Sequence, residues 1–243
     1  MEWEDLLNRN VSFYKVLSAR DQEELKNRIK IFIHEKQFEG CASVSITDEI
    51  RITVAAQACL MLLGDISDYY PKARSILIYP DSYVARVKNQ PRNSFVVTEG
   101  YESRIGEAWS MGNIVLAWNA VLQGAANSSD GRNVVIHEFA HNLDHEFDIS
   151  TFVEASPAYA ERKNKADWIV ALSREYRRLL NDVSRGKPTL LNQYGATNTA
   201  EFFAVSSEVF FEQPSELKKR HPELFQQLRS IYQLNPIELF DRS

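Results

Sequence analysis

Hydrophobic and polar positions alternate along the first part of the chain with two different periods. Segment 21–36 carries apolar side chains at helical spacing, which predicts an amphipathic helix with Asp21 as its cap. Segment 47–63 opens with Thr47 and two acidic residues and is then almost entirely apolar, which predicts a helix buried on most sides. Short β-branched or apolar runs predict strands at 75–79, 94–98 and 113–118.

Beyond a loop signal of small and polar residues at 127–131, the pattern becomes helical. Helices are predicted at 133–146, 163–185, 199–211 and 221–233. A few strands between helices, followed by a mainly helical second half, predict an α+β fold without regular βαβ alternation. The 243 residues are enough to bury a real core, and we expect one domain over 1–243, with 1–20 as an N-terminal extension.

The composition is that of a folded globular protein and excludes several function classes. Hydrophobic residues make up 44% of the chain and aromatic residues 11%, which is too much apolar surface for a disordered chain. The 28 basic and 33 acidic residues give a net charge of −5, which argues against direct binding to nucleic acid. No apolar run reaches the length of about 18 residues that a membrane span needs, and the acidic start of the chain does not resemble a secretory signal.

The two cysteines, Cys41 and Cys59, lie in or beside apolar runs and form no CxxC motif. A disulfide between them is one alternative. Because the chain shows no export signal, we expect instead that both are buried, reduced thiols, as is usual in the cytoplasm.

One short motif carries most of the chemical information. Residues 137–141 read His-Glu-Phe-Ala-His, the H-E-x-x-H pattern, within a predicted helix. Residues four apart on a helix share a face, so His137 and His141 can reach one metal ion, and Glu138 beside them can take a proton from metal-bound water. The alternative is a helix with two structural histidines, whose imidazoles would need other hydrogen-bond partners.

A catalytic zinc ion needs a third protein ligand and an open fourth position. His145 lies one turn beyond His141, too far to reach the same ion easily, so a carboxylate on a later helix is favoured. Glu201 and Glu208 share one face of an otherwise apolar helix, where a carboxylate is costly unless it is paired or bound to metal. Spacing alone leaves Glu201 open as a metal ligand or as a capping-box acid behind Asn198, with Glu208 as the next candidate ligand.

Several segments together carry a family resemblance. They are the Ile-Tyr-Pro run at 78–80, the segment 109–118, the HEFAHNLD core at 137–144 and the segment 194–211, with similar short runs at 38–40 and 46–50. In these segments the chain resembles the Mlc titration factor A family of zinc metallopeptidases, and the resemblance extends over about 20–235.

The resemblance implies a zincin-like metallopeptidase fold with a gluzincin-like site, similar to the catalytic core of anthrax lethal factor. It implies Zn²⁺ held by His137, His141 and Glu201, with Glu138 as general base. Tyr194 matches a family tyrosine placed to stabilise the oxyanion, a role that suits the hydrogen-bond donor of a phenol. The implied activity is hydrolysis of a peptide or protein substrate, with similarity to aminopeptidases.

Some positions depart from the family pattern or have weaker signals. Family members often carry a Gly- and Asp-rich loop where this chain has 145–150 without glycine, which bears on specificity. Thr199 replaces a common proline, which should alter only the start of its helix. Asp144 and Glu208 are candidates for accepting a hydrogen bond from a ligand imidazole, although each could be an ordinary acid on a helix face.

The resemblance also implies a second kind of function, in a regulatory binding protein. On this hypothesis the chain sequesters a transcriptional repressor that governs sugar uptake, and hydrolysis is secondary. The intact H-E-x-x-H motif with Glu138 favours the enzyme, because a protein that only binds has no need for a base.

Overall fold

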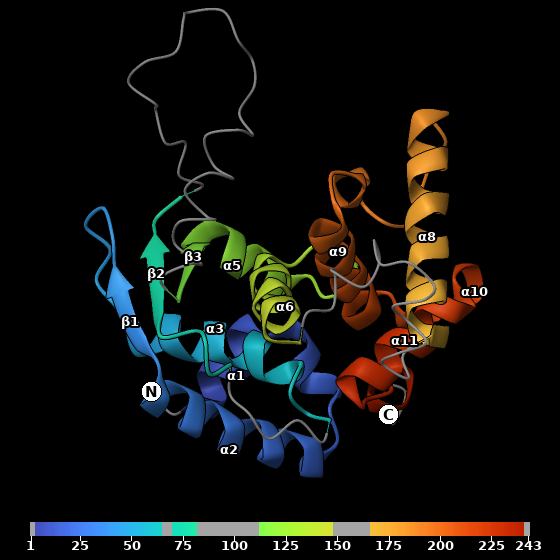
Figure 1. Cartoon of the computed structure of the whole chain (residues 1–243). Coiled ribbons are helices and arrows are strands. Elements are labelled where there is room, and N and C mark those ends of the chain that lie inside the picture. The colour runs from blue at the N-terminus through green and yellow to red at the C-terminus, as the bar shows by residue number, and fades with distance from the viewer. Residues whose placement is uncertain (1–2, 65–69, 82–111, 148–165, 241–243) are drawn as a thin grey trace, which may run out of the picture.

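The computed structural model describes residues 3–64, 70–81, 112–147 and 166–240. It is mainly helical, with a small parallel sheet on one side and the C-terminal helices on the other (Figure 1). The helices are α1 (Trp3–Asn10), α2 (Ala19–Glu35), α3 (Asp48–Leu60), α5 (Trp118–Ala126), α6 (Val134–Phe147), α8 (Ala166–Ser184), α9 (Thr199–Glu212), α10 (Pro214–Arg220), α11 (Pro222–Tyr232) and α12 (Pro236–Phe240), with short 3-10 helices η1 (Ser12–Val16) and η3 (Gln193–Ala196).

The sheet contains β1 (Gln37–Gly40), β2 (Ser75–Tyr79) and β3 (Asn113–Ala117), paired in parallel in that order. The predictions for β2 and β3 are confirmed, and the expected strand at 94–98 lies outside the described residues. The sequence pattern missed β1, because only Phe38 of its four residues is buried and no alternation shows. Parallel pairing requires a crossover, and α3 supplies one between β1 and β2. One βαβ unit is therefore present in a fold that remains α+β.

Helix starts follow the polar residues that cap them. Thr47 caps α3 as predicted, and its hydroxyl accepts a hydrogen bond from the backbone N–H of Ile50 at 3.3 Å. The prediction that Asp21 caps the helix at 21–36 is wrong. Ser18 is the cap, its hydroxyl accepts from the backbone N–H of Asp21, and α2 begins at Ala19. Asp21 stands at the third position of the helix instead, where its carboxylate accepts from the Ser18 hydroxyl at 2.6 Å.

The four helices predicted in the second half are confirmed as α6, α8, α9 and α11. Among the described residues four α-helices were not predicted: α1, α5, α10 and α12. Helix α5 begins at Trp118, which was expected to end a strand, and α10 follows α9 after a single residue. The apolar run at 114–118 continues from β3 into the first residue of α5, so periodicity alone did not separate the strand from the helix. In the described ranges no helix combines the length and the hydrophobicity needed to span a membrane.

Helix α6 lies between the sheet and α9 (Figure 1), and it contacts β3 on one side and α9 on the other. Its apolar face enters the core, where the Phe139 ring packs 5.6 Å from the ring of Phe32 and 4.6 Å from that of Tyr70. Because Phe139 faces the core, the face that carries His137 and His141 is left to meet α9. The core thus sets the rotation of α6.

The two cysteines are free thiols, as predicted, but their burial differs. Cys59 is buried in α3, and burial raises the pKa of its thiol. Cys41 is only half-buried, contrary to the prediction, because it leaves the sheet at the end of the edge strand β1.

Candidate metal centre

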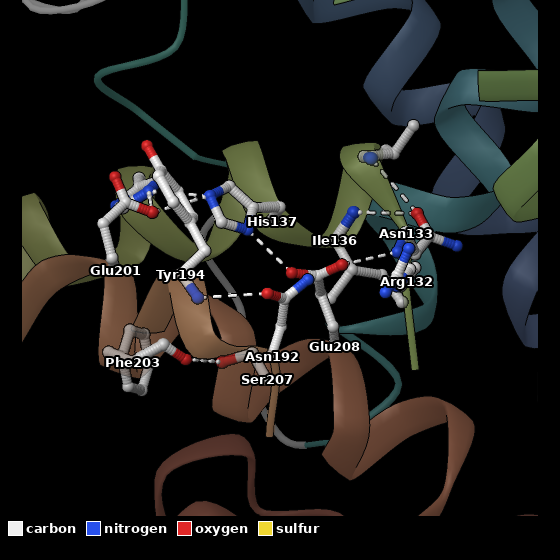
Figure 2. A network of polar contacts seen from close by, with 12 residues as sticks. Arg132, Asn133, Ile136, His137, Asn192, Tyr194, Glu201, Phe203, Ser207 and Glu208 are labelled. Atoms are coloured by element: carbon white, nitrogen blue, oxygen red, sulfur yellow. Dashed lines mark hydrogen bonds and ion pairs between the residues drawn. The ribbon is translucent and has the colours of Figure 1, made fainter. Parts of the chain in front are cut away.

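The two histidines of the motif face each other from successive turns of α6. Asn133 caps this helix, and its side-chain oxygen accepts from the backbone N–H groups of Val135 and Ile136, both at 3.1 Å. The spacing of four residues then brings the Nε2 atoms of His137 and His141 to 3.1 Å from each other. Both Nε2 atoms lie next to a carboxylate oxygen of Glu201 on α9, and Figure 2 shows the ring of His137 facing that helix.

Glu201 comes to the same point from the first turn of α9. The side chain of Asn198 accepts from the backbone N–H of Glu201 at 2.9 Å, so the helix is capped without using the Glu201 carboxylate. Carboxylate oxygen Oε2 of Glu201 lies 2.9 Å from Nε2 of His137 and 3.3 Å from Nε2 of His141. Of the two roles left open for Glu201, the side chain therefore takes the position of a ligand, while its backbone takes the cap.

These three atoms have the spacing and chemistry of a metal-ligand set. Ligand atoms bound to a tetrahedral zinc ion at about 2.0–2.1 Å lie about 3.3–3.4 Å from one another. The observed separations of 2.9, 3.1 and 3.3 Å are close to those values. Within the described part of the chain, His137, His141 and Glu201 form the one group of at least three such residues whose ligand atoms come together, all within 4.8 Å. A His₂Glu donor set fits zinc.

The charges around the histidines favour a cation between them. Burial lowers the pKa of His137, but hydrogen bonds to Glu201 and Glu208 outweigh burial and raise that pKa to about 10. Burial raises the pKa of Glu201, but its hydrogen bonds with the two histidines outweigh it and lower that pKa to about 2. The pKa of His141 is lowered by burial and by the neighbouring charge of His137. These neighbours therefore favour positive charge between the two helices, either as a proton on His137 or as a metal ion in its place.

Glu208 contacts the far side of the first imidazole. Its Oε1 atom lies 2.7 Å from Nδ1 of His137, and its Oε2 atom accepts from the backbone N–H of Asn133 at 2.6 Å (Figure 2). A carboxylate at Nδ1 keeps the proton there and leaves the lone pair on Nε2 for a metal ion. Glu208 thus occupies the outer position that was one of its two expected roles, and Asp144, the other candidate for that role, is buried on α6.

Glu138 and Tyr194 stand next to this group. Glu138 follows His137 on α6 and is 5% exposed. Tyr194 belongs to η3, where its backbone N–H donates to the side chain of Asn192 at 3.0 Å. The ring of Tyr194 lies alongside that of His137 (Figure 2), with 6.1 Å between the ring centroids. The structure therefore brings His137, His141 and Glu201 together and sets the ring of Tyr194 beside them, while Glu138 is the buried neighbour of His137 on α6.

The chain that carries this site is similar to known proteins over nearly its whole length. A family model described as glucose-regulated metallo-peptidase M90 matches residues 1–233. The chain belongs to this family. An uncharacterized protein of Synechocystis sp. is 38% identical over 97% of this chain and 84% of its own length. Proteins called Mlc titration factor A from Serratia proteamaculans and Klebsiella pneumoniae are each 27% identical, over 99% and 98% of this chain and 90% and 88% of their own. The resemblance stated from the sequence motifs is confirmed.

Sequence reasoning missed one further buried acid of this M90-family protein, which contacts the start of α6 rather than the candidate ligands. Glu212 accepts hydrogen bonds at the start of α6, from the loop that ends in Asn133. The signal was present, because Glu201, Glu208 and Glu212 are spaced by seven and four residues and form one stripe of acids on a nearly fully buried helix. Of the segment 145–150, which departs from the family pattern, residues 145–147 form the end of α6 and 148–150 lie outside the described residues.

Proposed function

We propose that this M90-family protein is a zinc-dependent peptidase whose ion is held by His137, His141 and Glu201. The observation that carries the proposal is the triangle of ligand atoms at 2.9–3.3 Å from two helices. Membership of a metallopeptidase family supports it. When bound, zinc supplies polarisation of the substrate carbonyl and a lowered pKa for the attacking water.

The other residues supply proton transfer and charge stabilisation. Glu138 takes the proton of the attacking water and passes it to the leaving amine, and its buried position beside His137 is suited to both steps. Tyr194 donates a hydrogen bond from its hydroxyl to the oxygen that becomes negative in the tetrahedral state. Glu208 keeps His137 in the tautomer that offers Nε2. The roles of Glu138 and Tyr194 follow from the family resemblance and from their place beside the ligand triangle.

Metal analysis joined to peptide hydrolysis tests the proposal. We expect about one zinc ion per chain, in line with a single His₂Glu site, and hydrolysis that a chelator stops and added zinc restores. An aminopeptidase should cleave peptides with a free amino terminus faster than the same peptides with a blocked one. Equal rates on both would contradict the aminopeptidase assignment, and hydrolysis that continues after complete removal of metal would contradict the metal mechanism.

Zinc affinity should also rise with pH, because His137 must lose a proton before it can bind the ion. Its pKa is raised to about 10, so at neutral pH the metal-free site is protonated and must lose that proton to offer Nε2. His141, whose pKa is lowered, is already neutral. Zinc affinity should therefore rise about tenfold for each pH unit between about pH 6 and 8, with one proton released. Titration calorimetry in buffers of different ionisation enthalpy measures the release, and an affinity that does not change with pH would contradict the assignment.

A second function is proposed because relatives over nearly the whole chain are called Mlc titration factor A. On this proposal the protein binds a transcriptional repressor of the Mlc type in the cytoplasm, a compartment in keeping with its two free thiols. The test mixes the purified protein with purified Mlc, with and without chelator. A complex that survives chelation with the repressor uncleaved supports the binding function, and the absence of any complex rejects it.

A further inference from the structure

Glu212 is a buried acid on α9 that the proposed mechanism does not use. It lies one turn beyond Glu208, and its side chain reaches the loop that leads into α6. Its Oε2 atom accepts from the backbone N–H groups of Gly131 and Arg132, both at 2.9 Å. Its Oε1 atom accepts from the side-chain amide of Asn133 at 3.2 Å. These three partners are all donors, an arrangement that suits an ionised carboxylate.

The position is unfavourable for a charge unless those donors are in place. Glu212 is only 7% exposed, and burial raises its pKa to about 8. The N–H groups of Asn133 and Arg132 act against that rise, whereas the charges of Asp130 and Glu208 add to it. The carboxylate thus ties the start of α6 to α9, and the hydrogen bonds offset part of its desolvation.

Asn133 connects this contact to the metal centre. Its side-chain oxygen caps α6, and its backbone carbonyl accepts from the backbone N–H of His137 at 2.9 Å. Its own backbone N–H donates to one oxygen of Glu208, whose other oxygen holds Nδ1 of His137. The placement of Asn133 therefore acts on both the backbone and the ring of His137.

We propose that Glu212 is a positioning residue for the metal centre, which acts through Asn133 to hold His137 in its ligating orientation. This rests on the proposed function, since it takes His137 to be a metal ligand. The decisive feature is the direction of one hydrogen bond, which Nδ2 of Asn133 donates to Oε1 of Glu212. The amide of Asn133 cannot turn round, because its oxygen already accepts two backbone N–H groups as the helix cap.

The substitution Glu212→Gln tests the direction of this hydrogen bond, because it replaces one acceptor oxygen by an NH₂ donor and hardly changes the shape of the side chain. The introduced amide oxygen can still accept from the two backbone N–H groups, but its NH₂ group then faces the NH₂ group of Asn133. We expect zinc affinity to fall about tenfold. It is measured by competition with a chromophoric chelator at about pH 9, where the wild-type carboxyl is ionised. Glu216→Gln, the same change on the exposed helix α10, is the matched control and should leave the affinity unchanged.

A compensating pair of substitutions separates the specific contact from a general loss of structure. Asn133→Asp alone keeps the helix cap but sets a second carboxylate against that of Glu212, and it should also weaken zinc binding about tenfold. In the double variant N133D/E212Q the introduced aspartate can accept from the introduced glutamine, and the net charge equals that of the wild type. We therefore expect its affinity to lie within about twofold of wild type rather than to show the sum of two losses.

Thermal unfolding of the metal-free wild type and its variants completes the experiment. A Glu212→Gln protein that is less stable but binds zinc as tightly as wild type would overturn the proposal, as would a double variant with additive losses. If a single variant does not fold, recovery of fold and affinity in the double variant still supports the pairing, and failure to recover overturns it. A wild-type protein without zinc affinity overturns the proposed function as well, whereas tight wild-type binding that Glu212→Gln leaves unchanged overturns the role of Glu212 alone.

Discussion

The variant Glu138→Gln should bind zinc as the wild type does, yet hydrolyse peptides about 100- to 10,000-fold more slowly, the range typical for loss of a general base. Glu138 follows His137 directly on α6, so its side chain is turned by about 100° from that of His137, and an ion held by His137, His141 and Glu201 would not need Glu138 as a ligand. Glutamine has nearly the same shape, and it can still accept a hydrogen bond from water, but it cannot take a proton. Substrate binding should change little, since the proton moves only as the transition state forms.

The measurement pairs kcat and KM on one peptide with the zinc content of the same sample. Glu24→Gln is a matched control, because Glu24 is exposed on α2 and forms a surface salt bridge with Arg28. Its activity should equal that of the wild type. Hydrolysis by Glu138→Gln at the normal rate, with normal metal content, would show that another group takes the proton and would reject the proposed mechanism.

Two glutamates on one helix should respond very differently to the same substitution. Glu201→Gln removes the charge of a proposed ligand and should lower zinc affinity by more than about 100-fold, since it acts directly on the ion rather than through an imidazole. Glu208→Gln leaves the ligands in place and should lower the affinity only about tenfold. The smaller effect arises because the introduced amide oxygen can still accept from Nδ1 of His137, while its NH₂ group meets the backbone N–H of Asn133.

Zinc competition assays on the two variants at one pH show which substitution lowers the zinc affinity more. Both side chains are similarly covered, with 12% of Glu201 and 10% of Glu208 exposed, so burial alone predicts similar effects on folding. A difference in affinity therefore reports their positions relative to the ion. Equal zinc affinity in the two variants, or the larger loss in Glu208→Gln, would contradict the assignment of Glu201 as the ligand.

Local features of the fold were predictable where one residue and its near neighbours decide them. Thr47 followed by acidic residues marks the start of α3, and the H-E-x-x-H spacing places two imidazoles on one face of α6. Local signals failed where neighbouring candidates compete. Ser18 rather than Asp21 caps α2, since its hydroxyl accepts from the backbone N–H of Asp21, one of the first-turn N–H groups that has no partner within the helix. β1 has one buried residue and becomes a strand only because β2 lies beside it.

The amino-acid sequence by itself determined which functional groups this protein can bring to a site. They are two histidines one helical turn apart, a carboxylate between them in sequence, and a later helix with acids along one face. It did not decide which acid meets the histidines, because helical periodicity places Glu201, Glu208 and Glu212 on the same face equally well. That choice depends on how α9 crosses α6, which is a matter of packing between segments about 60 residues apart. Burial of Phe139 against Phe32 and Tyr70 rotates α6, and the crossing then gives each acid a different partner.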